Sequence, residues 1–172
     1  MFPRLNHLAQ SRNVVLMRTV HQWLNEYGDS HRNATNKALH WICVPVILWS
    51  VVGLLWSLPI PHSMRMIGPG VNWGSIAVAG ALVYYAVLSV PLTLGVLPVL
   101  LAMLWSIALL DRAEYPPVWM ACALFFLLAW IGQFVGHAIE GKHPSFFKDV
   151  QFLMIGPLWL LADLYRRLGI RF

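Results

Sequence analysis

Charged side chains are scarce in this sequence. Asp, Glu, Lys and Arg make up 11% of the 172 residues, and hydrophobic residues make up 59%, whereas an average soluble domain carries about 25% charged residues. So few charges cannot cover a water-facing globule of this size, which excludes a soluble domain. The length is near that of one domain and leaves no room for a soluble head on a separate anchor. We therefore expect residues 1–172 to form a single integral membrane domain.

Several other features are missing. The sequence has two cysteines, Cys43 and Cys122, each within an apolar run, so we expect no disulfide framework. Residues 1–13 hold no long apolar stretch, so no cleavable signal peptide is expected. No Gly-rich phosphate loop, nucleophile elbow or paired-cysteine zinc spacing occurs. The net charge is +5, but the basic residues are scattered, so we do not expect nucleic acid as a partner.

Long apolar runs are abundant instead. A spanning helix needs about 20 mostly apolar residues, and four runs qualify, at about 39–58, 71–90, 92–110 and 118–139. No Asp, Glu, Lys or Arg falls inside them. The second and third runs are so close that we expect a tight hairpin around Pro91 to Gly95. The sequence thus predicts an all-α fold, a polytopic membrane helical bundle with four transmembrane helices.

Two further segments flank these spans. Residues 13–27 mix apolar and polar side chains as an amphipathic helix at the interface does. Residues 150–168 are apolar enough to cross, but Gly156-Pro157 interrupts them and Asp163 lies within them, so we predict an interfacial or re-entrant helix.

The basic residues predict the orientation, because cytoplasmic flanks are enriched in Lys and Arg. With four spans, both termini and the stretch after span four share one side. That side holds Arg4, Arg12, Arg18, Arg32, Lys37, Lys142, Lys148, Arg166, Arg167 and Arg171. The other side holds only Arg65 and Arg112. We therefore expect both termini to be cytoplasmic.

Two segments are too polar for their depth in the membrane. One runs from Tyr27 to His40, before and into span one, and the other from Gln133 to Pro144, at the end of span four. Polar groups at membrane depth are costly unless they are paired or ligated. Four spans bring both segments to the cytoplasmic face, so we expect them to form one site.

Helical spacing shows which of these side chains share a face. Gln133, His137 and Glu140 stand at i, i+4 and i+7, and Asn36 and His40 at i and i+4. The histidines at positions 31 and 40 lie about 180° apart on a continuous helix. They converge only if the chain breaks between them, and Asn33 or Thr35 is a suitable N-cap for a new helix.

The histidines of these segments have the chemistry of metal ligands, since neutral imidazoles bind Fe, Zn, Cu and Ni. The candidate ligands are His31, His40 and His137, with His143 as a candidate fourth. Glu140 and Gln133 would orient an imidazole through its other ring nitrogen, or Glu140 would itself be a carboxylate ligand. Each residue also has an ordinary interpretation. The histidines resemble hydrogen-bonded interfacial residues, Asn36 a helix cap, and Lys37 a contact for lipid phosphate.

The two segments resemble those of a known family. The first reads Tyr27-x3-His31-x4-Asn36-Lys37-x2-His40-x4-Pro45, and the second Gln133-Phe-x-Gly-His137-x2-Glu140-Gly-x2-Pro144. This pair of motifs resembles the 2-hydroxy fatty acid dioxygenase family, over about residues 20 to 165. The intervening spans resemble that family only in being apolar.

The resemblance implies an enzyme that requires Fe(II). It would use O2 to shorten a 2-hydroxy fatty acid by one carbon and release the carboxyl carbon as CO2. The implied iron-site residues are His31, His40 and His137, and Asn36 and Glu140 match motif positions. Lys37, Arg32 or Lys142 would offset the substrate carboxylate. A bacterial inner membrane, or the endoplasmic reticulum of a eukaryote, would be the location.

The residues alone leave other classes of function open. A membrane transporter or a scaffold for lipid-modifying partners needs no metal, although transporters place polar ligands near the midplane and often contain repeats, and none is visible here. A di-iron desaturase or hydroxylase needs more histidines than this chain offers. A zinc-dependent lipid hydrolase would use the same imidazoles. The sequence identifies no protein partner.

Overall fold

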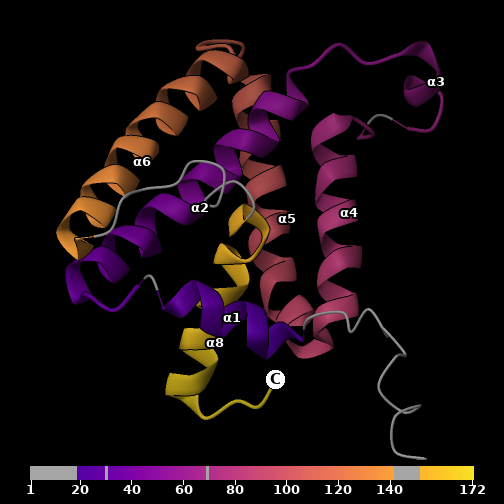
Figure 1. Ribbon diagram of the computed structural model, residues 1–172. Helices are drawn as coiled ribbons and strands as arrows, with labels where there is room; N and C mark the ends of the chain where they lie inside the picture. The colour runs from indigo at the N-terminus through magenta and orange to yellow at the C-terminus, as the bar shows by residue number, and fades with distance from the viewer. Residues whose placement is uncertain (1–18, 30, 69, 142–151) are drawn as a thin grey trace, which may run out of the picture.

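The computed structural model describes residues 19–29, 31–68, 70–141 and 152–172, and every regular element within them is a helix (Figure 1). The prediction of an all-α fold is confirmed for these residues. The elements are α1 (Val20–Gly28), α2 (Ala34–Trp56), α3 (His62–Arg65), α4 (Trp73–Leu88), α5 (Val90–Arg112), α6 (Val118–Glu140), the short 3-10 helix η1 (Phe152–Met154) and α8 (Gly156–Leu168).

Three of these helices have the length and composition of membrane spans. α2, α5 and α6 contain 23 residues each and are predominantly apolar, which indicates an integral membrane protein. The fourth predicted span, 71–90, corresponds to the shorter apolar helix α4, with 16 residues. Its length is about 24 Å at 1.5 Å per residue, against a hydrocarbon core of about 30 Å.

The turn between α4 and α5 lies at Ser89, so the sequence-based placement of the hairpin at Pro91 to Gly95 is wrong. Ser89 has an extended backbone and its side chain accepts a hydrogen bond from the backbone N–H of Leu92 at 3.4 Å. It therefore begins α5, and Pro91 falls in the first turn. Proline is tolerated there because the first N–H groups of a helix have no partner within the helix.

Small residues bring α2 and α6 close together, and these form the most extensive helix pair. A Cβ atom at Gly132 would lie 2.6 Å from the Sγ of Cys43, and one at Gly53 would collide with the Sγ of Cys122. Both cysteines are buried and free, as the sequence predicts. The two helices run antiparallel (Figure 1), so the start of α2 lies beside the end of α6.

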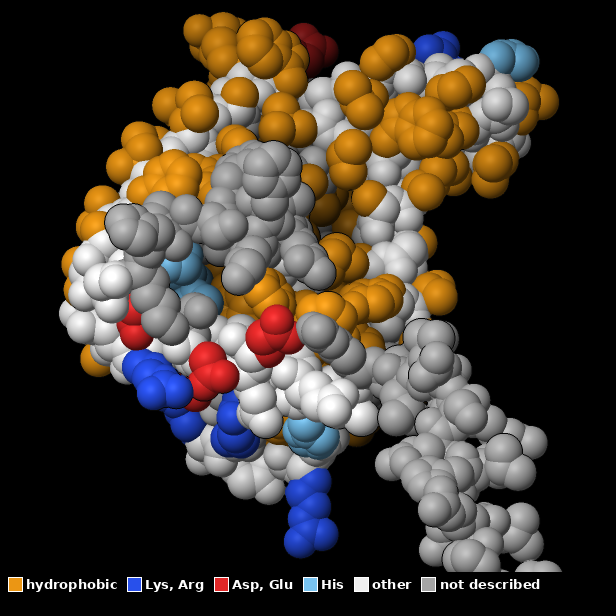
Figure 2. Space-filling model, viewed as in Figure 1, with side chains coloured by type: hydrophobic (Ala, Val, Ile, Leu, Met, Phe, Trp, Pro, Cys, Tyr) orange, Lys and Arg blue, Asp and Glu red, His pale blue; other side chains and the backbone are white. Residues whose placement is uncertain are grey.

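The helices α1 and α8 lie at this same end of the molecule (Figure 1). Helix α1 covers the second half of the predicted amphipathic segment, and residues 13–18 lie outside the described residues. Helix α8 starts at Gly156, where the sequence predicts an interruption, and its 13 residues extend about 20 Å, too short to cross a bilayer. Figure 2 shows most charged side chains of the visible face at this end and hydrophobic side chains over the remainder.

Candidate metal centre

A break in the chain between α1 and α2 places the first histidine of the site. The side chain of Asn33 accepts hydrogen bonds from the backbone N–H of Thr35 at 2.8 Å and of Asn36 at 3.3 Å. It is thus the N-cap that starts α2, one of the two candidates from the sequence. His31 lies in the link before it and turns back toward His40.

Three histidines from separate parts of the fold meet behind this link. His31 comes from the link, His40 from α2 and His137 from α6, and their side chains are 4%, 1% and 5% exposed. One ring nitrogen of each lies within 4.8 Å of the others. The Nε2 atoms of His31 and His40 are 2.8 Å apart. The three-histidine group is therefore buried and compact enough to hold a single metal ion.

Backbone carbonyls fix the orientation of two of these rings. The Nδ1 of His31 lies 2.6 Å from the carbonyl oxygen of Tyr27, and the Nδ1 of His40 lies 2.9 Å from that of Asn36. A carbonyl oxygen only accepts, so both Nδ1 atoms must donate. A neutral imidazole has one proton, which leaves a lone pair on each Nε2.

These two lone pairs face each other at 2.8 Å and repel unless a cation or an extra proton lies between them. Imidazoles held by an Nδ1–H bond to a carbonyl are the usual arrangement of metal-ligating histidines. The donor set, three imidazoles, suits a divalent transition metal such as Fe(II) or Zn(II). The residues present therefore fit a metal ion.

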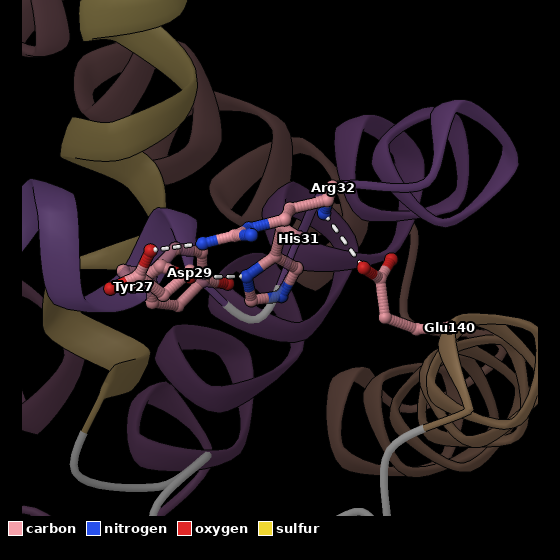
Figure 3. Close-up of polar contacts among 5 residues, drawn as sticks. All are labelled: Tyr27, Asp29, His31, Arg32 and Glu140. Carbon is pink, nitrogen blue, oxygen red and sulfur yellow. Dashed lines mark hydrogen bonds and ion pairs between the residues drawn. The ribbon is translucent and has the colours of Figure 1, made fainter.

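Glu140 connects α6 to the link that carries the first histidine (Figure 3). Its two carboxylate oxygens accept hydrogen bonds from the backbone N–H groups of Arg32 and Asn33, both at 2.9 Å, and from the amide of Asn36 at 3.0 Å. Both carboxylate oxygens of Glu140 thus accept hydrogen bonds from N–H groups, and Glu140 is not part of the three-histidine group. Its hydrogen bonds therefore join the end of α6 to the link and to the start of α2.

The close approach of α6 to α2 continues up to the site. Asn36 is fully buried, and a Cβ atom on Gly136 would collide with its Oδ1 atom. Gly136 immediately precedes His137, and His40 stands one turn after Asn36. The glycine therefore lets the two helices come near enough for their histidines to meet.

Gln133 faces a narrow cavity beside the second histidine. The cavity has a volume of about 30 Å³. It is lined by Gln133 and His40 and by apolar side chains that include Val44 and Ile47. Gln133 is 7% exposed, and its Oε1 accepts no hydrogen bond within the described residues. The sequence-based expectation that it orients an imidazole is thus not what its oxygen does here. A buried acceptor facing room for about two waters is suited to a small polar ligand.

Two aromatic side chains pack against the first histidine of the three-histidine group. The ring of Tyr27 stacks on that of His31, with centroids 4.3 Å apart, and Trp159 of α8 lies 5.3 Å from both rings. Sequence reasoning left Tyr27 undecided and missed Trp159, because a tryptophan in an apolar helix carries no local sign of its neighbours. The candidate fourth ligand, His143, and the candidate charge partner Lys142 lie outside the described residues.

Comparison with known proteins now identifies the family. Residues 17–168 match the family described as Mpo1-like, 2-hydroxy-palmitic acid dioxygenase. The chain belongs to this family. Over 150 residues it is 30% identical to the 2-hydroxy-palmitic acid dioxygenase MPO1 of Saccharomyces cerevisiae, an alignment that covers 85% of this chain and 79% of the yeast protein. No solved structure matches.

Membership of the Mpo1-like family confirms the resemblance inferred from the two motifs. The match includes the whole three-histidine group and extends from α1 to the end of α8. It thus covers the two helices that the sequence analysis placed outside the spans.

Proposed function

We propose that this protein is an Fe(II)-dependent dioxygenase that shortens 2-hydroxy fatty acids by one carbon. One 2-hydroxy acid and one O2 give the shorter acid, CO2 and water, so O2 accepts all four electrons and no separate reductant is consumed. The observation that carries the proposal is the pair of opposed Nε2 atoms in the buried three-histidine group. Membership of a dioxygenase family supports the reaction type.

The three histidines would hold the iron, and Fe(II) bound there would supply the activation of O2. The carbonyls of Tyr27 and Asn36 keep two of the ligating rings in the required tautomer. Glu140 holds the α1–α2 link against the end of α6 and so keeps the histidine of the link close to the other two.

The other polar residues of the site would handle the substrate. The Oε1 of Gln133 has no hydrogen-bond partner in the described part of the chain and is available to accept a hydrogen bond from the 2-hydroxyl group. The adjoining cavity walls of Val44 and Ile47 suit the first carbons of the acyl chain. The acyl tail would remain among the apolar helices, and Lys37 would offset the carboxylate charge.

For the membrane we propose four crossings, with α4 included and α8 at the interface. Both termini would be cytoplasmic, because ten of the twelve Lys and Arg residues then lie on that side. The membrane would be a bacterial inner membrane. Reporters that are active on only one side of the membrane, fused to each terminus, test this orientation. Opposite signals from the two ends would contradict it.

Metal analysis of anaerobically purified protein tests the proposed chemistry, followed by incubation with 2-hydroxypalmitic acid and O2. We expect bound iron and equal amounts of CO2 and the acid shorter by one carbon. Alanine at His31, His40 or His137 should abolish both, and His62→Ala, an exposed histidine of α3, should change neither. Full activity of the triple variant would refute the proposal. Bound zinc with no O2-dependent product would instead favour a zinc hydrolase.

A further inference from the structure

A polar cleft of about 500 Å³ reaches the first histidine of the metal centre. Its walls come from three helices: Gly28 at the end of α1, Lys37 in the first turns of α2, and Trp159 and Arg166 of α8. The largely buried His31 also contributes to its lining. The volume is in the range of small-molecule sites. The proposed iron ligand thus borders a cleft that α8 helps to form.

The acidic residues of this cleft are already neutralised. Asp29 forms an ion pair with Arg32 at 2.9 Å, and Asp163 forms one with Arg167 at 2.8 Å. Neither arginine lines the cleft. Figure 3 shows the first pair, with the guanidinium of Arg32 extended toward Asp29. Arg32, a candidate charge partner for the substrate in the sequence analysis, is therefore committed elsewhere.

The two cationic residues of the cleft keep their charge available. Within the described residues, no carboxylate lies at ion-pair distance from Lys37 or Arg166. Among the residues that the structure describes, the one hydrogen bond of the Arg166 side chain runs from its Nε to the carbonyl of Ala162, at 3.2 Å. The terminal nitrogens of its guanidinium remain available for a ligand. The cleft therefore presents two positive charges and is also lined by the buried His31.

We infer that this cleft is the carboxylate subsite of the enzyme. Lys37 and Arg166 bind the carboxylate of the 2-hydroxy acid, and they hold its hydroxyl-bearing carbon toward the three-histidine group. A guanidinium binds a carboxylate through two parallel hydrogen bonds and an ammonium binds it as a point charge. The substrate class rests on the proposed function. The subsite makes α8 part of the active site and the source of selectivity for a free acid over an ester or alcohol.

Charge removal tests the subsite. Lys37→Met and Arg166→Met keep most of the stem of the side chain and remove its charge, and Arg171→Met, a described basic residue at the same end of the chain that does not line the cleft, is the matched control. We expect each cleft variant to raise KM for 2-hydroxypalmitic acid about tenfold, with kcat and iron content near those of the wild type. Arg166→Lys should recover part of the loss.

Inhibitors test recognition of the carboxylate group separately from recognition of the acyl chain. Palmitic acid should inhibit the wild type, and both methionine variants should weaken this inhibition about tenfold while inhibition by hexadecanol stays unchanged. The same measurements in nanodiscs of phosphatidylcholine alone distinguish the acid from anionic lipid headgroups. A loss of affinity that appears only with anionic lipids would overturn the subsite in favour of headgroup binding.

Two further outcomes separate this inference from the proposed function. If both methionine variants keep the KM and the palmitic acid inhibition of the wild type, or if they lose iron, the subsite is refuted. The proposed reaction is not affected by either result. A wild type that binds palmitic acid through the two charges but produces no CO2 would support the subsite and refute the proposed reaction.

Discussion

Gly136→Ala and Gly80→Ala add the same methyl group to two apolar helices, α6 and α4, and we expect effects of opposite sign. At Gly136 the new Cβ would collide with the Oδ1 of Asn36 and lie 3.5 Å from Leu39. Asn36 is fully buried and its amide donates to Glu140 at 3.0 Å, so it cannot turn away without losing that bond. At Gly80 nothing lies within 4 Å of an added Cβ.

The magnitudes follow from these surroundings. Overpacking a close contact costs about 1–3 kcal/mol, and the higher helix propensity of alanine returns about 1 kcal/mol of this. Gly136→Ala should therefore destabilise the protein by up to about 2 kcal/mol, and Gly80→Ala should stabilise it by about 0.5–1 kcal/mol. The displaced α6 also moves His137 away from His40, so we expect the affinity for Fe(II) to fall about tenfold, which is about 1.4 kcal/mol.

Thermal unfolding in detergent micelles and anaerobic titration with Fe(II) measure these two effects. We expect the melting temperature and the iron affinity to fall together in Gly136→Ala, and only the melting temperature to change, upward, in Gly80→Ala. A Gly136→Ala protein that is stabilised like the control and binds iron as tightly as the wild type would refute the close α2–α6 contact as the feature that assembles the site.

Three further predictions concern the polar groups of the site. Glu140→Gln replaces a charged acceptor of three hydrogen bonds at a partly exposed position, so we expect a loss of about 1 kcal/mol in stability and weaker iron binding in titration. Glu114→Gln, an exposed carboxylate beyond the end of α5, should change neither, and an equal effect of the two would contradict the positioning role. Gln133→Leu removes a buried acceptor that has no partner among the described residues. Thermal stability should therefore be unchanged or higher, and KM for 2-hydroxypalmitic acid should rise. Lower stability with unchanged KM would argue against a hydroxyl contact. Removal of iron with a chelator should lower the melting temperature, because a ligand at 100 times its Kd stabilises by about 2.7 kcal/mol, and an unchanged melting temperature on re-addition of Fe(II) would contradict a metal held by the folded state.

Much of this protein could be predicted from the sequence because its signals are local. Apolar runs and scarce charge indicate membrane helices, and three of them have the predicted length. The 3.6-residue period places Gln133 and His137 on one face of α6, and both are buried. Asn33 or Thr35 predicts a helix start, and the helix begins directly after Asn33. The spacing of the two motifs was sufficient to indicate the family.

Some features of the site follow only from the tertiary structure, because they depend on contacts between helices. The sequence left Glu140 as either a ligand or an orienting group, and its bonds to the α1–α2 link exist only because α6 ends beside that link. Likewise Trp159 and Arg166 carry no sign of a site in the sequence. The packing of α8 against α1 and α5 brings the ring of Trp159 to 5.3 Å from that of His31 and places Arg166 in the same cleft. Helical periodicity fixes which residues share a face, but the approach of one helix to another is fixed by the small residues and side-chain shapes at their interface.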